Sequence, residues 1–104
     1  TTEAIEQLNE AIQINPDLPE AHLILAILLT AQGKYKEATD HLSITIRSRP
    51  DIFMAHYYLG LIAEAQGKHD EAVQHFQDTL RLQPDFEKAK NDLRKALTLQ
   101  RKMH

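Results

Sequence analysis

The chain has 104 residues, of which 42% are hydrophobic and 26% charged, and its formal net charge is −3. This mixture is typical of one compact globular domain and excludes a disordered chain. The lack of cysteine excludes disulfides, thiolate zinc sites and cysteine nucleophiles, and it leaves the cellular compartment open. The longest uninterrupted apolar run, Leu23 to Leu29, is far shorter than a membrane span.

Charge is distributed unevenly along the chain. Residues 1–33 hold five acidic residues and no lysine or arginine, whereas residues 87–104 hold six basic residues and two acidic ones. Two solvated helix ends explain this pattern most simply. The alternatives are a field that steers partners, or end-to-end contact between copies of the chain. Nucleic-acid binding is disfavoured, because the basic residues are confined to one end of an acidic chain.

The first predicted element is a helix over residues 3–14. Ala4, Leu8 and Ala11 lie at helical spacing, and Pro16 ends the segment because its ring cannot continue the hydrogen-bond ladder.

The second predicted helix spans residues 19–32. Asp17 is an N-cap candidate, and Glu20 follows three residues later, which predicts a capping box. Apolar residues fall at helical spacing on one face of this helix, and Leu23, Ile24 and Ile27 add a second apolar face. A helix that is apolar nearly all round is normally covered on every side.

Four further helices are predicted over residues 35–48, 53–66, 69–82 and 87–101. Gly33 and Gly67 suit the left-handed conformation that ends a helix. Because each turn is short, the helices on either side of it are expected to pack antiparallel.

An internal period of 34 residues organises the whole chain. Segments 19–52 and 53–86 are identical at 14 of 34 positions, and the stretch AQGKYKEA at 31–38 returns as AQGKHDEA at 65–72. Prolines that precede an aspartate recur at the same interval, at Pro16, Pro50 and Pro84. Such a period predicts a stack of identical helix–turn–helix units.

These features resemble the tetratricopeptide repeat family, whose unit is a helix–turn–helix of 34 residues. The family pattern G-x-Y-x-x-A appears as Gly33, Tyr35 and Ala38 in the first copy. In the second copy, His69 replaces the tyrosine between Gly67 and Ala72.

Other positions fit the family pattern or depart from it. The small-residue site that faces the paired helix is Ala26 and then Gly60, and the large apolar site on the second helix is Leu42 and then Phe76. The usual tryptophan site holds a histidine in both copies, at positions 22 and 56.

The resemblance implies an all-α, right-handed α-solenoid of antiparallel helix–turn–helix repeats. Residues 1–18 then form the second helix of an incomplete N-terminal repeat, residues 19–52 and 53–86 are full repeats, and residues 87–104 form a C-terminal capping helix. Because the first residue is Thr1, a fragment or a processed form is expected.

The resemblance also implies a protein–protein interaction module. The first helix of each unit lines a concave groove in the family, which predicts a binding site for an apolar peptide or amphipathic helix of another protein. The expected groove residues are Leu23, Ile24, Ile27, Met54, Tyr57, Tyr58, Leu61, Lys88, Asn91 and Lys95. Tyrosine and methionine suit such a surface, because they offer large contact areas at low entropic cost.

Two alternatives remain open for the apolar face of helix 19–32. A first helix that the N-terminal half-repeat lacks could cover it, or the exposed face could drive self-association into a homo-oligomeric scaffold. The chain could also be the docking arm of a larger multidomain protein.

One known family ligand is disfavoured. Members that hold the acidic C-terminal tails of chaperones share lysine, asparagine and arginine residues in their groove. The matching positions here are Leu23, Ile27, Tyr58, Lys88 and Asp92, and only Lys88 keeps the residue type. The ligand is therefore expected to be apolar rather than a charged tail.

Six histidines prompt a search for a metal site, and none is predicted. His22 and His56, like His41 and His75, are one repeat apart, which is too far for one ion in a stack of helices. His41 and His75 are expected on the outer helical surface, and the other pair at packed, partly wet positions. The two serines lack the surroundings of a nucleophile, so neither an enzyme nor a cofactor is predicted.

Overall fold

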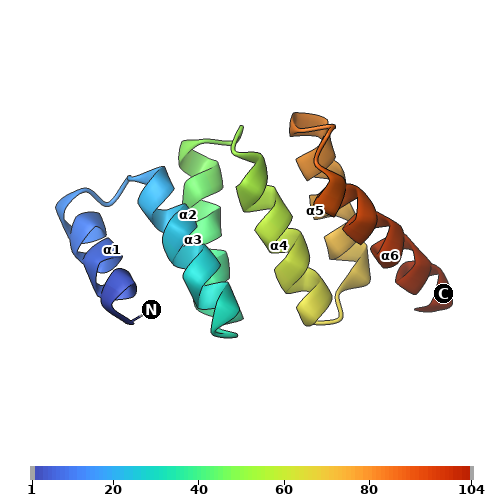
Figure 1. Cartoon of the computed structure of the whole chain (residues 1–104), viewed down its shortest axis with the longest axis horizontal. Coiled ribbons are helices and arrows are strands. Elements are labelled where there is room, and N and C mark those ends of the chain that lie inside the picture. The colour runs from blue at the N-terminus through green and yellow to red at the C-terminus, as the bar shows by residue number, and fades with distance from the viewer. Residues whose placement is uncertain (1, 104) are drawn as a thin grey trace. The chain divides into compact units, whose positions relative to one another are not determined.

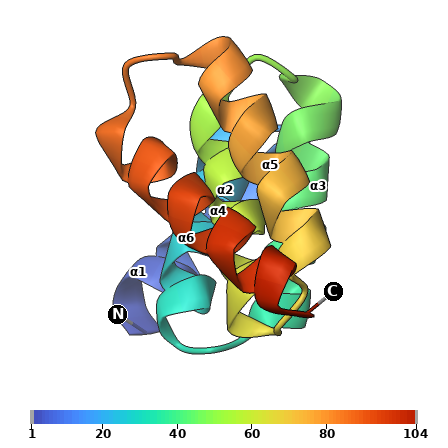
Figure 2. The ribbon, with the colours of Figure 1, turned by 90° about the vertical axis from the view of Figure 1, so that its right-hand side faces the viewer.

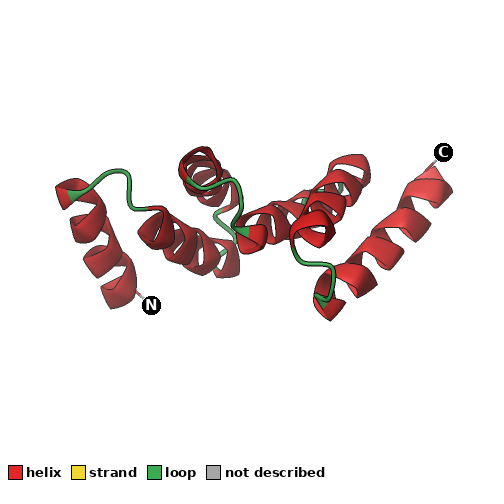
Figure 3. Cartoon of the chain, turned by 90° about the horizontal axis from the view of Figure 1, so that it is seen from above, coloured by secondary structure: helices red, strands yellow, loops and turns green. Residues whose placement is uncertain are grey.

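The computed structural model describes residues 2–103, which form six helices and no strand (Figures 1 and 3). The helices are α1 (Thr2–Ile14), α2 (Pro19–Ala31), α3 (Tyr35–Ser48), α4 (Phe53–Ala65), α5 (His69–Leu82) and α6 (Glu87–Met103). The predicted all-α class is confirmed, and every helix end lies within two residues of its predicted position. None of the helices in the described range has both the length and the hydropathy that crossing a membrane requires.

The chain divides into two compact units, Thr1–Asp51 and Ile52–His104. Unit 1 contains α1, α2 and α3, and unit 2 contains α4, α5 and α6. In unit 1, α2 packs against both α1 and α3. In unit 2, α5 packs against α4 and α6, as Figure 2 shows for the α5–α6 pair.

The core of unit 1 lies between α2 and α3. Its fully buried side chains include Leu25 and Ala26 from α2 and Leu42 and Thr45 from α3. The buried hydroxyl of Thr45 donates to the carbonyl of His41, at 2.9 Å, so it is satisfied within its own helix. None of the described residues of α1 is buried, so α1 lies at the edge of this core.

The core of unit 2 is larger and more aromatic. Phe76 of α5 is fully buried, and Tyr57 of α4 and Ala89 of α6 lie in the same cluster. The ring of Phe76 lies against the Cα of Gly60, because a Cβ built on that glycine would lie only 2.6 Å from Phe76 Cδ1. Thr79 repeats the arrangement of the buried threonine in unit 1, since its hydroxyl donates to the carbonyl of His75 at 2.8 Å.

The two short turns confirm the glycine prediction. Gly33 and Gly67 both have φ of 75°, which is the left-handed region that favours glycine. The residue after each glycine closes the preceding helix, since Lys34 N–H donates to Leu29 O at 2.9 Å and Lys68 N–H to Ala63 O at 2.8 Å. The repeated AQGK stretch therefore ends one helix and lets the chain reverse.

The predicted capping box at Asp17 and Glu20 is wrong. Within the described chain, the N-cap of α2 is Leu18, which makes no side-chain capping hydrogen bond, and Pro19 opens the helix. Asp17 lies one residue too early, and its own N–H donates to Asn15 Oδ1 at 3.3 Å. Proline at the first helical position removes one of the free N–H groups that a cap would serve.

Candidate protein-binding site

The central feature of unit 2 is a hydrogen bond that joins α4 to α6. The hydroxyl of Tyr57, a residue only 6% exposed, donates to Asp92 Oδ2 at 2.5 Å. The Tyr57 ring also packs edge-on against Phe86, with the ring centres 4.9 Å apart. Burial and this carboxylate raise the pKa of Tyr57, so the phenol keeps its proton. Because Tyr57 is buried, this predicted groove residue offers little surface and instead holds the two helices together.

Three other predicted residues of α4 are partly accessible. Met54, Tyr58 and Leu61 are half-buried and pack against the unit 2 core. The ring of Tyr58 meets that of Tyr57 edge-on, with centres 5.8 Å apart. These side chains combine a fixed inner part with an accessible outer part, which is the property of a preorganised apolar contact surface.

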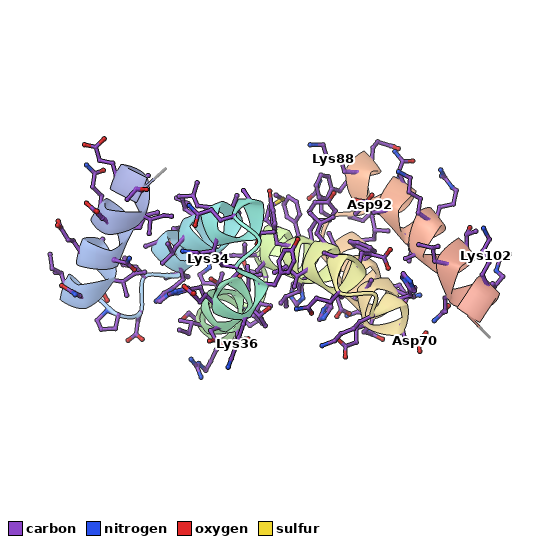
Figure 4. The ribbon with its side chains drawn as sticks, turned by 90° about the horizontal axis from the view of Figure 1, so that it is seen from below. Lys34, Lys36, Asp70, Lys88, Asp92 and Lys102 are labelled. Carbon is purple, nitrogen blue, oxygen red and sulfur yellow. The ribbon has the colours of Figure 1, made fainter. Side chains whose placement is uncertain are left out.

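The predicted residues of α6 are polar and exposed. Lys88, Asn91 and Lys95 are all exposed, and Figure 4 shows Lys88 and Asp92 in the first half of α6. Asn91 Oδ1 accepts a hydrogen bond from Arg94 at 3.2 Å. Within residues 2–103, neither Lys88 nor Lys95 forms an ion pair, so both ammonium groups are available to an acidic partner.

Unit 1 carries the other three predicted residues, all on α2. Leu23 and Ile27 are half-buried, and Ile24 is 48% exposed. The buried residues of α2 lie on one other face of this helix, so its apolar residues cover more than the buried face. The ten predicted residues thus form two sets, three in unit 1 and seven in unit 2.

The histidines lie differently from the sequence prediction, which is wrong in placing His41 and His75 on the outer helical surface. His22 is 2% exposed, and its Nδ1 lies 2.9 Å from Nδ1 of His41, a half-buried residue 19 positions later. His75 is also half-buried, and its Nδ1 is buried without a hydrogen-bond partner among the described residues. Burial lowers the pKa of both His41 and His75.

Sequence reasoning missed this pairing because it compared histidines only at helical and repeat spacing. An antiparallel hairpin that turns at Gly33 can bring the first turn of α2 beside the middle of α3. That geometry was the available signal for His22 and His41. Across residues 2–103, no group of three or more histidine, cysteine, aspartate or glutamate side chains is placed to hold a metal ion.

Two family models match the sequence. A model described as "Tetratricopeptide repeat" matches residues 25–87, and one described as "TPR repeat" matches residues 1–33. The comparison with curated proteins gives no significant match.

Solved structures with the same fold cover nearly all of the chain. A structure of MamA protein is 26% identical with a TM-score of 0.89, and the match covers 95% of this chain and 54% of that one. The first TPR of Spaghetti (RPAP3), bound to an HSP90 peptide, is 23% identical with a TM-score of 0.89, and 93% of this chain and 77% of that chain are covered.

An O-GlcNAc transferase mutant of Thermobaculum terrenum is 29% identical with a TM-score of 0.84, and the match covers 89% of this chain and 18% of that one. The chain therefore spans about half of the MamA structure and a small part of the transferase. Together these neighbours confirm the all-α helical solenoid class.

Proposed function

Because the chain belongs to the tetratricopeptide repeat family, we propose that it is a protein-interaction module whose partner docks on α4 and α6 of unit 2. One observation carries this proposal. The Tyr57–Asp92 hydrogen bond joins α4, which carries half-buried Met54, Tyr58 and Leu61, to α6, which carries the exposed lysines. A preorganised apolar surface that is flanked by unpaired cations suits a peptide or amphipathic helix.

The proposed partner segment is apolar with flanking acidic residues. Its apolar side chains would contact Met54, Tyr58 and Leu61, and a carboxylate on its edge would lie near Lys88 or Lys95. The Spaghetti structure shows that the fold can carry a bound peptide, in that case one from HSP90. An acidic chaperone tail is not the partner proposed here, because Tyr58 and Asp92 replace the polar and basic groups that would hold it.

Catalysis is not part of this proposal. The family is generally a non-catalytic interaction module, so a reaction would belong to another domain of a longer protein or to the bound partner. We also propose the repeat boundaries and the cap at residues 87–104 that the sequence period predicts.

A peptide library displayed on phage tests the proposed surface without a known partner. We expect enriched peptides to combine aliphatic or aromatic residues with one or two acids. Leu61→Glu should weaken their binding at least tenfold, because it places a carboxylate on the apolar surface next to the ligand's own acids. Tyr57 is a poor probe, since its removal would disturb the core.

The matched control is Ile24→Glu, which changes an exposed apolar residue of unit 1 in the same way. Circular dichroism should show unchanged helicity for both variants. Enrichment of acidic tails whose binding survives Leu61→Glu would refute the proposed surface. Equal losses in both variants would instead move the binding site to a surface that includes α2.

Self-association is a second candidate function, favoured by the exposed face of α6. An open hollow there is lined by Arg94, Lys95, Thr98 and Leu99, and α1 carries exposed acidic residues. Light scattering after size exclusion, over a concentration series, would detect such oligomers. Their dissociation in high salt would assign them to charge contacts, and salt-insensitive oligomers would assign them to apolar ones.

A further inference from the structure

In the pair α2–α3, two successive hydrogen bonds link a backbone carbonyl to two histidine rings inside the protein. His22 Nε2 lies 2.7 Å from the carbonyl oxygen of Pro16, and His22 Nδ1 lies 2.9 Å from His41 Nδ1. The ring centres of the two histidines are 5.1 Å apart, so the two Nδ1 atoms point at each other across the gap. The loop between α1 and α2, the start of α2 and the middle of α3 are therefore joined by two imidazoles.

The hydrogen-bond partners fix which ring nitrogens of His22 and His41 carry a hydrogen. A carbonyl oxygen only accepts, so His22 Nε2 must carry the hydrogen that it donates to Pro16. Neutral His22 then has a lone pair on Nδ1, and His41 must donate its Nδ1 hydrogen to it. The neutral pair is fully satisfied, and it has no place for a second proton between the rings.

We propose that His22 and His41 form a proton-sensitive latch, which holds the α1–α2 loop, α2 and α3 together at neutral pH and opens in mild acid. A proton added to His22 Nδ1 would place two N–H groups head to head in a buried position. A proton on the outer nitrogen of His41 would place a charge in a half-buried position. Either event favours separation of the two rings.

The charged groups around the latch set the direction of its pH dependence. Burial and His22 on α2 lower the pKa of His41, and they outweigh Asp40 and Glu37 on α3, which raise it. No charged group of α1 acts on His41 among the described residues. The unfolded chain therefore takes up a proton near the ordinary pKa of 6.5, before the folded chain does. Stability is complete above that pH and is lost as pH falls below it.

The second helix pair repeats the two positions and provides an internal comparison. His56 on α4 and His75 on α5 correspond to His22 and His41. Burial lowers the pKa of His75, and His56 lowers it further. Asp78 and Glu71 on the same helix as His75 oppose this effect. This couple lies in unit 2, so changes there should leave the loop around Pro16 unaffected.

Hydrogen exchange measured by NMR at pH 7.5 and pH 5.5 tests the latch at residue level. After correction for the chemical exchange rate, we expect the amides of residues 18–24 in the natural chain to lose about tenfold in protection per pH unit where one extra proton binds the open form. His41→Gln keeps an N–H donor for His22 but removes one of the two imidazoles that can take up a proton, so this loss should become clearly smaller. The double variant His56→Phe with His75→Leu should retain it.

Nitrogen-15 chemical shifts of the imidazoles test the latch in the unchanged protein. At pH 7.5, His22 should carry its hydrogen on Nε2 and His41 on Nδ1. Protection that does not change with pH, or that falls as steeply in His41→Gln as in the natural chain, would overturn the proposal. So would a folded protein in which His22 carries a hydrogen on Nδ1.

Discussion

The pairs α2–α3 and α4–α5 share their register but fill one buried contact in opposite ways. In α4–α5, Gly60 leaves room for the ring of Phe76, which is fully buried against it. The corresponding positions in α2–α3 hold Ala26 and Leu42, both 0% exposed. In α4–α5 the residue on the first helix is smaller and the residue on the second helix is larger, while the summed volume of the two side chains stays similar. Packing density, rather than residue identity, is what the two pairs have in common.

The largest effect is expected when α4 receives the alanine of α2 while α5 keeps its phenylalanine. Gly60→Ala would add a Cβ under 3 Å from the ring of the fully buried Phe76, so we expect a cost at the upper end of the usual range for overpacking, about 3 kcal/mol. Alanine recovers at most about 1 kcal/mol as the better helix former. Urea unfolding should therefore show a net loss of stability. The matched change, Ala26→Gly in the first pair, creates no clash.

Adding Phe76→Leu to Gly60→Ala completes the exchange and should restore stability. The double variant then holds the alanine and leucine of the first pair, so the two changes should couple by about 0.5–3 kcal/mol in a double-mutant cycle. Strict additivity would show that the two contacts are not equivalent, and it would break the comparison between the pairs.

An intermediate and equal effect is expected at the two turns. Gly33→Ala and Gly67→Ala each force a Cβ into the left-handed region, at about 1–2 kcal/mol. Among the described residues, apart from the two chain neighbours, no atom lies within 4 Å of that Cβ at either site. Thermal unfolding of the two variants should give matching losses. A clear difference between them would show that the surrounding unit, rather than the turn itself, sets the cost.

The smallest effect is expected at the end of the second helix of each pair. Arg49 forms ion pairs with Glu20 and Asp51 at 3.3 and 3.2 Å, whereas the corresponding residue in unit 2 is Gln83. Arg49→Gln therefore gives α2–α3 the residue that α4–α5 has at this exposed position. Melting temperature should change by little more than its error, and not at all in high salt. A large loss would reveal a structural role for this cluster in unit 1.

The fold could be predicted closely because a proline or a glycine follows each of the first five helices. Pro16, Pro50 and Pro84 cannot continue a helix, and Gly33 and Gly67 adopt the left-handed conformation that ends one, so these boundaries follow from backbone chemistry. The capping-box prediction was wrong because a matching pair of side chains, Asp17 and Glu20, does not determine at which residue the helix begins. Leu18 and Pro19 occupy the positions that the pattern assigned to the start of the helix.

The candidate site was harder to predict, since residues one position apart on a helix can differ in burial. Tyr57 and Tyr58 are adjacent and chemically identical, yet the first is buried against Phe86 and Asp92 and the second is half-accessible. Repeat register indicated their helix but not which side α6 would cover. The same limit applies to His41, whose contact with His22 depends on how α2 and α3 pack.

The contact between Gly60 and Phe76 also bears on how the chain avoids misassembly. Two helix pairs that share 14 of 34 residues could exchange partners during folding, because α5 has the same periodicity as α3. Docking of α5 on α2 would set the Phe76 ring against the methyl group of Ala26 in place of a glycine. Docking of α3 on α4 would leave a void between Gly60 and Leu42. Each mismatched hairpin would be less stable than the native one. The different side-chain sizes at these two contacts therefore help to select the correct partner among similar helices.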